Sequence, residues 1–326
     1  MTTLAAPPPL DEVAIQNRRR LVGVLYAALG AGLFSLKGVV IKLAFAEGLS
    51  VDQLLTLRMG FALPVYLVIG IWAFMRRRPG VGWKTYALAA ALGVLSYYVS
   101  SYLNFWGLKY VSAQLERLIL YIYPTIVALL AWAFLKERIT RRHMVALALA
   151  YIGVLVLFGA EIGHQGEDVI LGAGLVFTGA VLYAGYVVAS KGVIARMGSG
   201  LFTAFAMSAA SILFLAQAGA GMLVAPPPPV SMEGVGLAVV LAIFCTVIPS
   251  FLIAEAIGRI GPGPMSAIGG VGPVVAAWAA VVILHEPFGA PHLIAMALTI
   301  AGVWLLARPG RPRIGVAAAK AAAPAP

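Results

Sequence analysis

Charged side chains lie within long apolar segments of this chain, where they could bind a ligand or another charge. If the first such segment is a helix beginning at Leu21, Lys37 lies about 24 Å along it, at about 1.5 Å per residue. Glu116 and Arg117 begin a later segment. Because a charge in an apolar medium usually faces a partner or a water-filled cavity, Lys37 and Arg117 are candidates to meet an anionic group such as a carboxylate.

Glu116 and Arg117 allow two interpretations. Adjacent residues on a helix do not face each other, so we do not expect them to form a ready-made ion pair. Arg117, Tyr121 and Pro124 instead share one helix face, at positions i, i+4 and i+7. They belong either to a structural charge network that joins two apolar segments or to the mouth of a cavity.

Two other charged residues, Arg58 and Glu255, lie near the ends of apolar segments. Long charged side chains at such positions extend toward water while their stems stay in apolar surroundings. We therefore expect both at a surface. Glu116 and Glu255 are also the two candidate proton carriers, and the sequence does not choose between proton coupling and facilitated diffusion.

Hydroxyl groups form two stripes. In SYYVSSYLNFW, Ser96 to Trp106, one helix face carries Tyr97, Ser101 and Asn104, and the next face carries Tyr98, Tyr102 and Phe105. A buried tyrosine needs a partner for its hydroxyl, so these faces predict the lining of a cavity. A second stripe consists of Tyr183, Tyr186 and Ser190.

Other chemistry finds little support. The four histidines and the single cysteine, Cys245, form no cluster with metal-ligand spacing. The serine in MGSG, Met197 to Gly200, lacks the strand and triad partners of a nucleophile. We find no Walker A sequence, so ATP is not the expected energy source. The sequence therefore predicts no catalytic residue, no metal and no cofactor.

Composition places the chain in a lipid bilayer. Hydrophobic residues make up 62% and charged residues 11%, against about 45–50% and about 25% in soluble domains. A spanning helix needs about 20 apolar residues. Ten such segments are expected, at 21–46, 54–75, 86–106, 113–135, 144–159, 170–194, 202–224, 234–256, 265–284 and 293–307.

Lysine and arginine gather on one side of these ten segments. With the N-terminus inside, most of them fall in cytoplasmic tails and loops, whereas the outer loops are acidic or neutral. This distribution follows the positive-inside rule. It predicts both termini in the cytoplasm, and it explains the net charge of +11 as topology without a nucleic-acid partner.

The sequence also repeats itself at an offset of 149 residues. IYPTIVALLAWAFLKER, from Ile122, and VGPVVAAWAAVVILHEP, from Val271, place Pro124 and Glu137 opposite Pro273 and Glu286. Each copy holds five spans, an odd number, so the copies must enter the membrane from opposite sides. Inverted repeats with a midplane site between them are typical of secondary transporters. We expect Glu137 and Glu286 to close equivalent helix ends and carry no protons.

These patterns predict an all-α membrane protein of two inverted five-helix repeats. The expected parts are a cytoplasmic tail at 1–20, the first repeat at 21–160, an outer linker at 161–169, the second repeat at 170–307 and a cytoplasmic tail at 308–326.

On the duplicated five-span unit and its proline-to-glutamate span, residues 21–307 resemble the EamA-type drug/metabolite transporters. The resemblance implies an exporter with a central cavity lined by spans one, three, four, six, eight and nine, and with spans two, five, seven and ten at the periphery. On that plan the cavity residues are Lys37, Tyr97, Tyr98, Tyr102, Arg117, Tyr121, Tyr183, Tyr186 and Thr246, with Ser101 beside them.

A cavity rich in tyrosine and serine is most similar to that of the bacterial amino-acid exporters of the YddG group. The expected protein is a monomeric secondary transporter of the bacterial inner membrane that exports amino acids with broad selectivity by alternating access. Its partners would be the small-molecule substrate and membrane lipid. The alternatives are an exporter of a purine, vitamin or drug, a passive channel, and an intramembrane enzyme, for which the sequence offers no nucleophile and base.

Overall fold

The computed structural model describes residues 10–76, 81–120, 122–135, 141–223, 227–269 and 272–307, and its regular elements there are helices. The first copy holds α1 Leu10–Ser35, α2 Lys37–Ala46, α3 Val51–Met75, α4 Trp83–Gly93, η1 Val94–Val99, α5 Ser100–Gly107, α6 Ala113–Leu120, α7 Tyr123–Leu135 and α8 Arg141–Gln165. The second holds α9 Asp168–Met197, α10 Ser199–Met222, α11 Met232–Ala242, η2 Ile243–Val247, α12 Ile248–Ile260, α13 Pro262–Ile268, α14 Gly272–Leu284 and α15 Ala290–Ala307.

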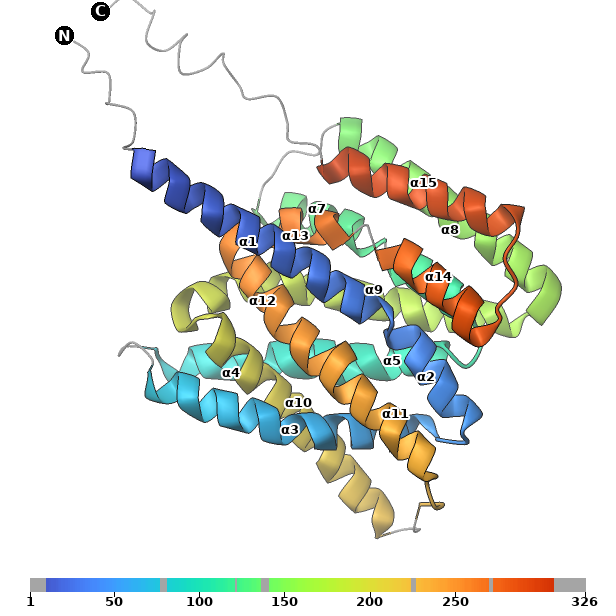
Figure 1. Ribbon diagram of the computed structural model, residues 1–326, viewed down its shortest axis with the longest axis horizontal. Helices are drawn as coiled ribbons and strands as arrows, with labels where there is room; N and C mark the ends of the chain where they lie inside the picture. The colour runs from blue at the N-terminus through green and yellow to red at the C-terminus, as the bar shows by residue number, and fades with distance from the viewer. Residues whose placement is uncertain are drawn as a thin grey trace, which may run out of the picture.

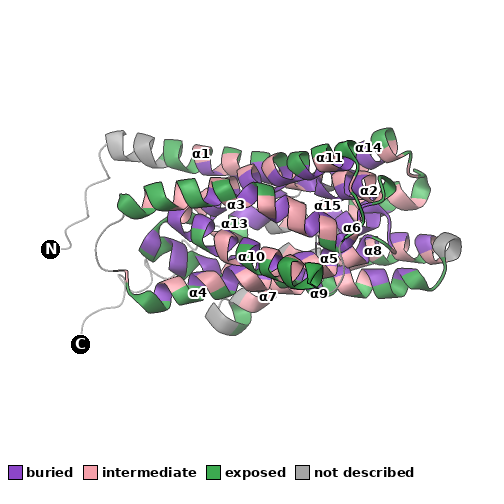
Figure 2. Cartoon of the chain, turned by 90° about the horizontal axis from the view of Figure 1, so that it is seen from below, coloured by how far each residue is buried: buried purple, intermediate pink, exposed green. Residues whose placement is uncertain are grey.

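The helices lie alongside one another in a bundle (Figure 1). We call the end at which α1 begins and α15 ends the proximal end, and the opposite end the distal end. Seen from the side, the outward faces carry most of the exposed residues and the interior is buried (Figure 2). Exposed positions include large apolar side chains such as Leu21, Trp72 and Trp278, as lipid-facing helices require.

Seven of the expected spans are long and apolar enough to cross a membrane within the described residues. They are Asn17–Ala46, Val51–Met75, Trp83–Gly107, Ala113–Leu130, Asp168–Met197, Ser199–Met222 and Met232–Ile260. The expected fifth, ninth and tenth spans contain shorter apolar helices, Tyr151–Ile162, Val274–Leu284 and Ala290–Gly302. Ten crossings therefore stay a prediction.

The first helices of the two copies run in opposite directions. The pair α1 and α2 leads from the proximal end to the distal end (Figure 1). Helix α9 begins at the distal end, where Gly172 lies against Tyr110, and ends at the proximal end, where Arg196 shares a surface groove with Lys84.

Interruptions of the helices recur at the 149-residue offset. The π-helical segments η1 and η2 begin at Val94 and Ile243, and the breaks between α6 and α7 and between α13 and α14 also coincide. Pro124 and Pro273 lie in the first turns of α7 and α14. Proline is tolerated there because the first N–H groups of a helix have no intrahelical acceptor. The proline thus begins a new half-helix instead of bending a continuous one.

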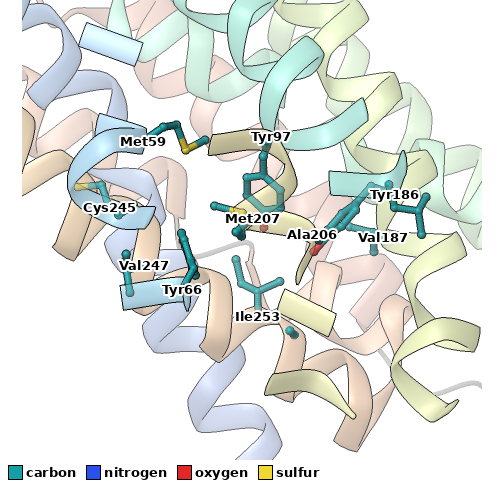
Figure 3. Close-up of a cluster of buried hydrophobic side chains, with 14 of the residues drawn as sticks. Met59, Tyr66, Tyr97, Tyr186, Val187, Ala206, Met207, Cys245, Val247 and Ile253 are labelled. Atoms are coloured by element: carbon teal, nitrogen blue, oxygen red, sulfur yellow. The ribbon is translucent and has the colours of Figure 1, made fainter. Parts of the chain in front are cut away.

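The core lies where helices of both copies meet. Figure 3 shows part of it, in which Met59 and Tyr66 of α3 approach Tyr97 of η1, Tyr186 of α9 and Cys245 of η2. Cys245 is buried and free. These contacts bring helices from distant parts of the sequence around one central volume.

A residue just after α14 caps the start of a helix in the other copy. His285 has a positive φ of 55°, and the Glu286 N–H donates to the Ala280 carbonyl at 3.2 Å, which ends the helix. The Glu286 carboxylate then accepts hydrogen bonds from the backbone nitrogens of Ala113 and Gln114 at 2.8 and 3.3 Å. These first donors of α6 have no partner within their own helix. Glu137, the corresponding residue of the first copy, lies outside the described residues.

Candidate functional site

A cavity of about 60 Å³ lies in the interior, between helices of both copies. The residues that line it include Phe34, Lys37, Arg58, Ser96, Tyr97, Ser100, Ser101, Asn104, Arg117, Tyr123, Tyr183, Thr246, Ile253 and Met265. Charged and aromatic side chains both contribute to this lining.

Arg117 fixes the break between α1 and α2. Its Nη2 donates to the backbone carbonyls of Phe34 and Ser35, at 2.9 and 3.0 Å. These carbonyls lie at the C-terminal end of α1, where the helix itself provides no N–H donor for them. A guanidinium there also complements the negative end of the helix dipole. The break has no counterpart in α9, which is continuous from Asp168 to Met197.

A polar chain crosses from α2 to α6 through α5. Lys37 Nζ donates to Asn104 Oδ1 at 2.6 Å, and Asn104 Nδ2 donates to Glu116 Oε1 at 2.8 Å. Glu116 also pairs with Lys37 at 3.8 Å and with Arg117 Nε at 3.7 Å. The expectation that Glu116 and Arg117 would not pair was therefore wrong. Their side chains meet because both are drawn into the bundle interior, where Glu116 is fully buried.

Arg58 was also misplaced by the sequence analysis, which put it at a surface. It is only 2% exposed, and its Cζ lies 4.8 Å from the Phe105 ring centroid. Lys37 Nζ lies 5.9 Å from the same centroid. Position along a helix gives depth, but the direction in which a side chain points depends on how the helix is packed. Helix α3, expected at the periphery, thus reaches the cavity.

Aromatic rings also line the cavity. Tyr183 of α9 stacks on Phe34 at 6.1 Å between ring centroids and meets Tyr123 at 5.5 Å in an edge-on geometry. Tyr186 lies beside Tyr183 and edge-on to Tyr97, at 5.8 and 5.4 Å. The predicted residues Tyr97, Ser101, Tyr183 and Thr246 line the cavity, and Tyr186 lies directly behind it.

Tyr98 and Tyr102 do not lie at the central cavity. They belong to a hydrogen-bond network near the distal end, where Tyr98 donates to Gln217 at 2.5 Å and Tyr102 donates to Asp52. Tyr102, Gln217 and Asp52 line a separate pocket of about 500 Å³ between α3, α5 and α10. The two predicted faces of this helix therefore serve different pockets.

The remaining candidates lie elsewhere. Glu255 is partly exposed near the proximal end, where it pairs with Arg259 at 2.9 Å and accepts a hydrogen bond from Ser199. It is not part of the cluster around Glu116. Tyr121 lies outside the described residues. No group of histidine, cysteine or acidic residues within the described part of the chain is placed to hold a metal ion.

Reasoning from the sequence missed Arg58 and Ser96, and it named Asn104 without making it a site residue. The signal for Asn104 was present, since it shares a face with Tyr97 and Ser101. The offset of 149 residues offers a further signal, because the charged and polar residues of this cluster in the first copy correspond to uncharged residues in the second copy. Lys37, Arg58, Asn104, Glu116 and Arg117 correspond to Tyr186, Met207, Ile253, Met265 and Ser266, all buried. The ionic groups of the cluster come from the first copy.

A protein family and two known transporters resemble this chain. A sequence profile of the EamA-like transporter family matches twice, over residues 21–159 and 170–308. An uncharacterized transporter of Bacillus subtilis (strain 168), YcbK, is 28% identical over 284 residues, which cover 83% of this chain and 88% of YcbK. A second uncharacterized transporter of that strain, YyaM, is 29% identical over 136 residues, covering 40% of this chain and 43% of YyaM.

The fold also has a counterpart among solved structures. One crystal structure superposes with a TM-score of 0.63 at 21% identity, over 87% of this chain and 95% of the other. At that identity the likeness concerns the fold alone.

Proposed function

The chain belongs to the EamA-like transporter family, and from this premise we propose that it exports small organic metabolites, amino acids among them, across the bacterial inner membrane. That it is a multi-pass membrane transporter of small molecules follows from the family and the apolar helices. The proposal adds the substrate, the direction and the mechanism. The mechanism is alternating access between two inverted five-helix repeats that together span the membrane ten times.

The observation that carries the proposal is the small interior cavity between helices of both copies. Its volume of about 60 Å³ is well below the roughly 300 Å³ of the smaller ligand pockets. A metabolite could enter only after helices move apart. The π segments η1 and η2 and the breaks beside α7 and α14 interrupt the regular helices, and such interruptions are where helices bend. These features support alternating access.

The chemistry of the lining supports an amino acid as substrate. Its carboxylate would lie beside the cations Lys37 and Arg58, and its ammonium group could be coordinated by the hydroxyls of Tyr97 and Ser101, directly or through water. Aromatic faces such as that of Tyr183 pack against side chains of different shapes. Selectivity among amino acids should therefore be broad.

Charge at the two ends supports cytoplasmic termini. The proximal end carries Lys84, Arg141, Arg196 and Arg259, whereas acidic residues such as Glu47, Asp52, Glu161, Asp168 and Glu233 lie toward the distal end. By the positive-inside rule, the proximal end would face the cytoplasm.

The test is uptake by proteoliposomes of labelled amino acids, purines and nucleosides, with and without an imposed proton gradient. Saturable flux of several amino acids that compete with one another is the expected result. Flux of purines alone would reject amino acids and keep the transporter. A rate that does not respond to the gradient would assign facilitated diffusion, and a rate that does would assign proton coupling. Absence of flux for every solute would contradict the proposal.

A further inference from the structure

Arg58 is a buried cation without a carboxylate partner among the described residues. It is 2% exposed, and the ion pairs found inside the bundle join Lys37 and Arg117 to Glu116. Two of its nitrogens, Nε and Nη2, are buried with no hydrogen-bond acceptor in the described part of the chain. Buried polar groups are nearly always hydrogen-bonded, and an arginine presents five donors. The guanidinium contacts the Phe105 ring, but these two nitrogens have no hydrogen-bond acceptor among the described residues.

The charges around the cavity do not balance either. Lys37, Arg58 and Arg117 are cations, and Glu116 is the one carboxylate within ion-pair distance of any of them in the described residues. Arg117 is already engaged by the carbonyls at the end of α1. Leaving a charge unpaired in an apolar interior costs several kcal/mol. An anion bound beside Arg58 would relieve that cost.

The surroundings of Arg58 suit one small anionic group. Phe105 holds the guanidinium of Arg58 and the ammonium of Lys37 near one ring, at 4.8 and 5.9 Å from its centroid. Ser96 also lines the cavity, and its hydroxyl has no hydrogen-bond partner among the described residues. At about 60 Å³ the cavity is much smaller than the pockets of roughly 300 Å³ or more that enclose whole ligands, so a small anionic group suits it.

Packing does not require a cation at this position. The corresponding residue of the second copy is Met207, which is fully buried in the same core. A methionine side chain has a similar length and adapts to irregular space. A charge at position 58 thus carries a cost that the equivalent position avoids.

We propose that Arg58, with Lys37 and the Ser96 hydroxyl, forms a carboxylate-binding site that holds the anionic group of the transported substrate. The guanidinium presents parallel N–H groups that match the two oxygens of a carboxylate. Since the ionic groups come from the first copy, the carboxylate stays with that copy while the second copy moves past it. The role of this site in transport rests on the proposed function, whereas binding of the anion does not.

Binding is tested on the full-length protein in detergent, by its thermal unfolding midpoint in acetate, in the neutral isostere acetamide and in chloride, at matched ionic strength. Ligands that bind only the folded state raise this midpoint. Acetate should raise it in a saturable way, and acetamide should not. A saturating effect of chloride with none of acetate would show a site for free inorganic anions and would overturn the carboxylate assignment.

Variants separate an anion site from a structural role. In Arg58→Met, acetate binding should weaken by about tenfold to a hundredfold, as for the loss of a charged hydrogen bond, while the midpoint without acetate should rise. Arg58→Lys should keep part of the response and serves if the methionine variant does not fold. Arg259→Met, which removes an exposed cation at the proximal end, should leave the response unchanged. A lower midpoint with an intact acetate response in Arg58→Met would overturn the proposal.

Transport separates this inference from the proposed function. Acetate binding through Arg58 in a protein that moves no solute would leave the anion site standing and reject the transporter's substrate assignment. Flux of amino acids that is unchanged in Arg58→Met would keep the substrate assignment and reject Arg58 as the site that holds the substrate's anionic group.

Discussion

The Glu286 carboxylate lies 2.8 Å from the backbone nitrogen of Ala113, so a residue at the end of α14 caps the start of α6 in the other copy. A second carboxylate approaches the same helix end, where Glu161 accepts hydrogen bonds from the backbone nitrogen and the hydroxyl of Ser112. Anionic groups stabilise a helix N-terminus through its free N–H groups and its dipole. At the distal end of the bundle, carboxylates in α8 and just after α14 therefore accept hydrogen bonds from the backbone at the start of α6 and hold these helices together.

Replacing Glu286 by glutamine removes the charge and one of the two acceptor oxygens, and it should destabilise the fold by roughly 0.5–2 kcal/mol, the range for altered helix caps. The measurement is the thermal unfolding midpoint of the purified protein. Glu233→Gln, at an exposed carboxylate in the first turn of α11, is the matched control and should change little. If Glu286→Gln alters the pH dependence of transport more than the midpoint, Glu286 carries protons and the structural role is wrong.

Asn104 connects Lys37 to Glu116, so Asn104→Ala should leave a buried donor and acceptor without partners. The expected cost is about 1–3 kcal/mol for each unsatisfied group. Ser101→Ala, at a neighbouring residue of the cavity wall, should cost less because it removes no link in this chain. Equal unfolding midpoints for the two variants would show that the polar chain does not stabilise the bundle.

Gly93 should not tolerate alanine. A Cβ there would lie 2.0 Å from the backbone oxygen of Ala206, closer than atoms can approach. Gly93→Ala must therefore separate α4 from α10 or prevent folding, and the yield of monodisperse protein measures this. Gly174→Ala, on an open face of α9 with no atom within 4 Å, should fold normally. A normal yield of Gly93→Ala would show that the two helices can move apart without cost.

The two tyrosine-lined pockets make different predictions for transport. Tyr183→Ala removes a wall of the central cavity and should reduce flux strongly, whereas Tyr102→Ala changes the separate distal pocket and should reduce it less. Proteoliposome uptake at several substrate concentrations measures both. The opposite order would place the distal pocket on the transport path.

Topology is tested by reporter fusions after Gly163 and after Pro309. The charge distribution predicts the first reporter outside and the second in the cytoplasm. A cytoplasmic signal from the first fusion would contradict the inverted arrangement of the two copies.

The central site could be predicted only in part. The period of 3.6 residues correctly grouped Tyr97, Ser101 and Asn104, which all line the cavity. It also grouped Tyr98 with Tyr102, but it could not show that this face serves another pocket. Periodicity tells which residues share a face, and only the packing of η1 against α10 and of α5 against α3 decides what each face meets.

Composition and the 149-residue offset determined the membrane class and the duplicated plan, because apolar spans and repeated prolines are properties of short segments. The tertiary structure decided how the charges are used. In the folded bundle Arg58 lies against Phe105, Arg117 donates to the carbonyls at the end of α1, and the Glu286 carboxylate accepts from the start of α6. Each of these contacts joins residues 47 or more positions apart, and their energies depend on distance and burial, which local sequence does not contain.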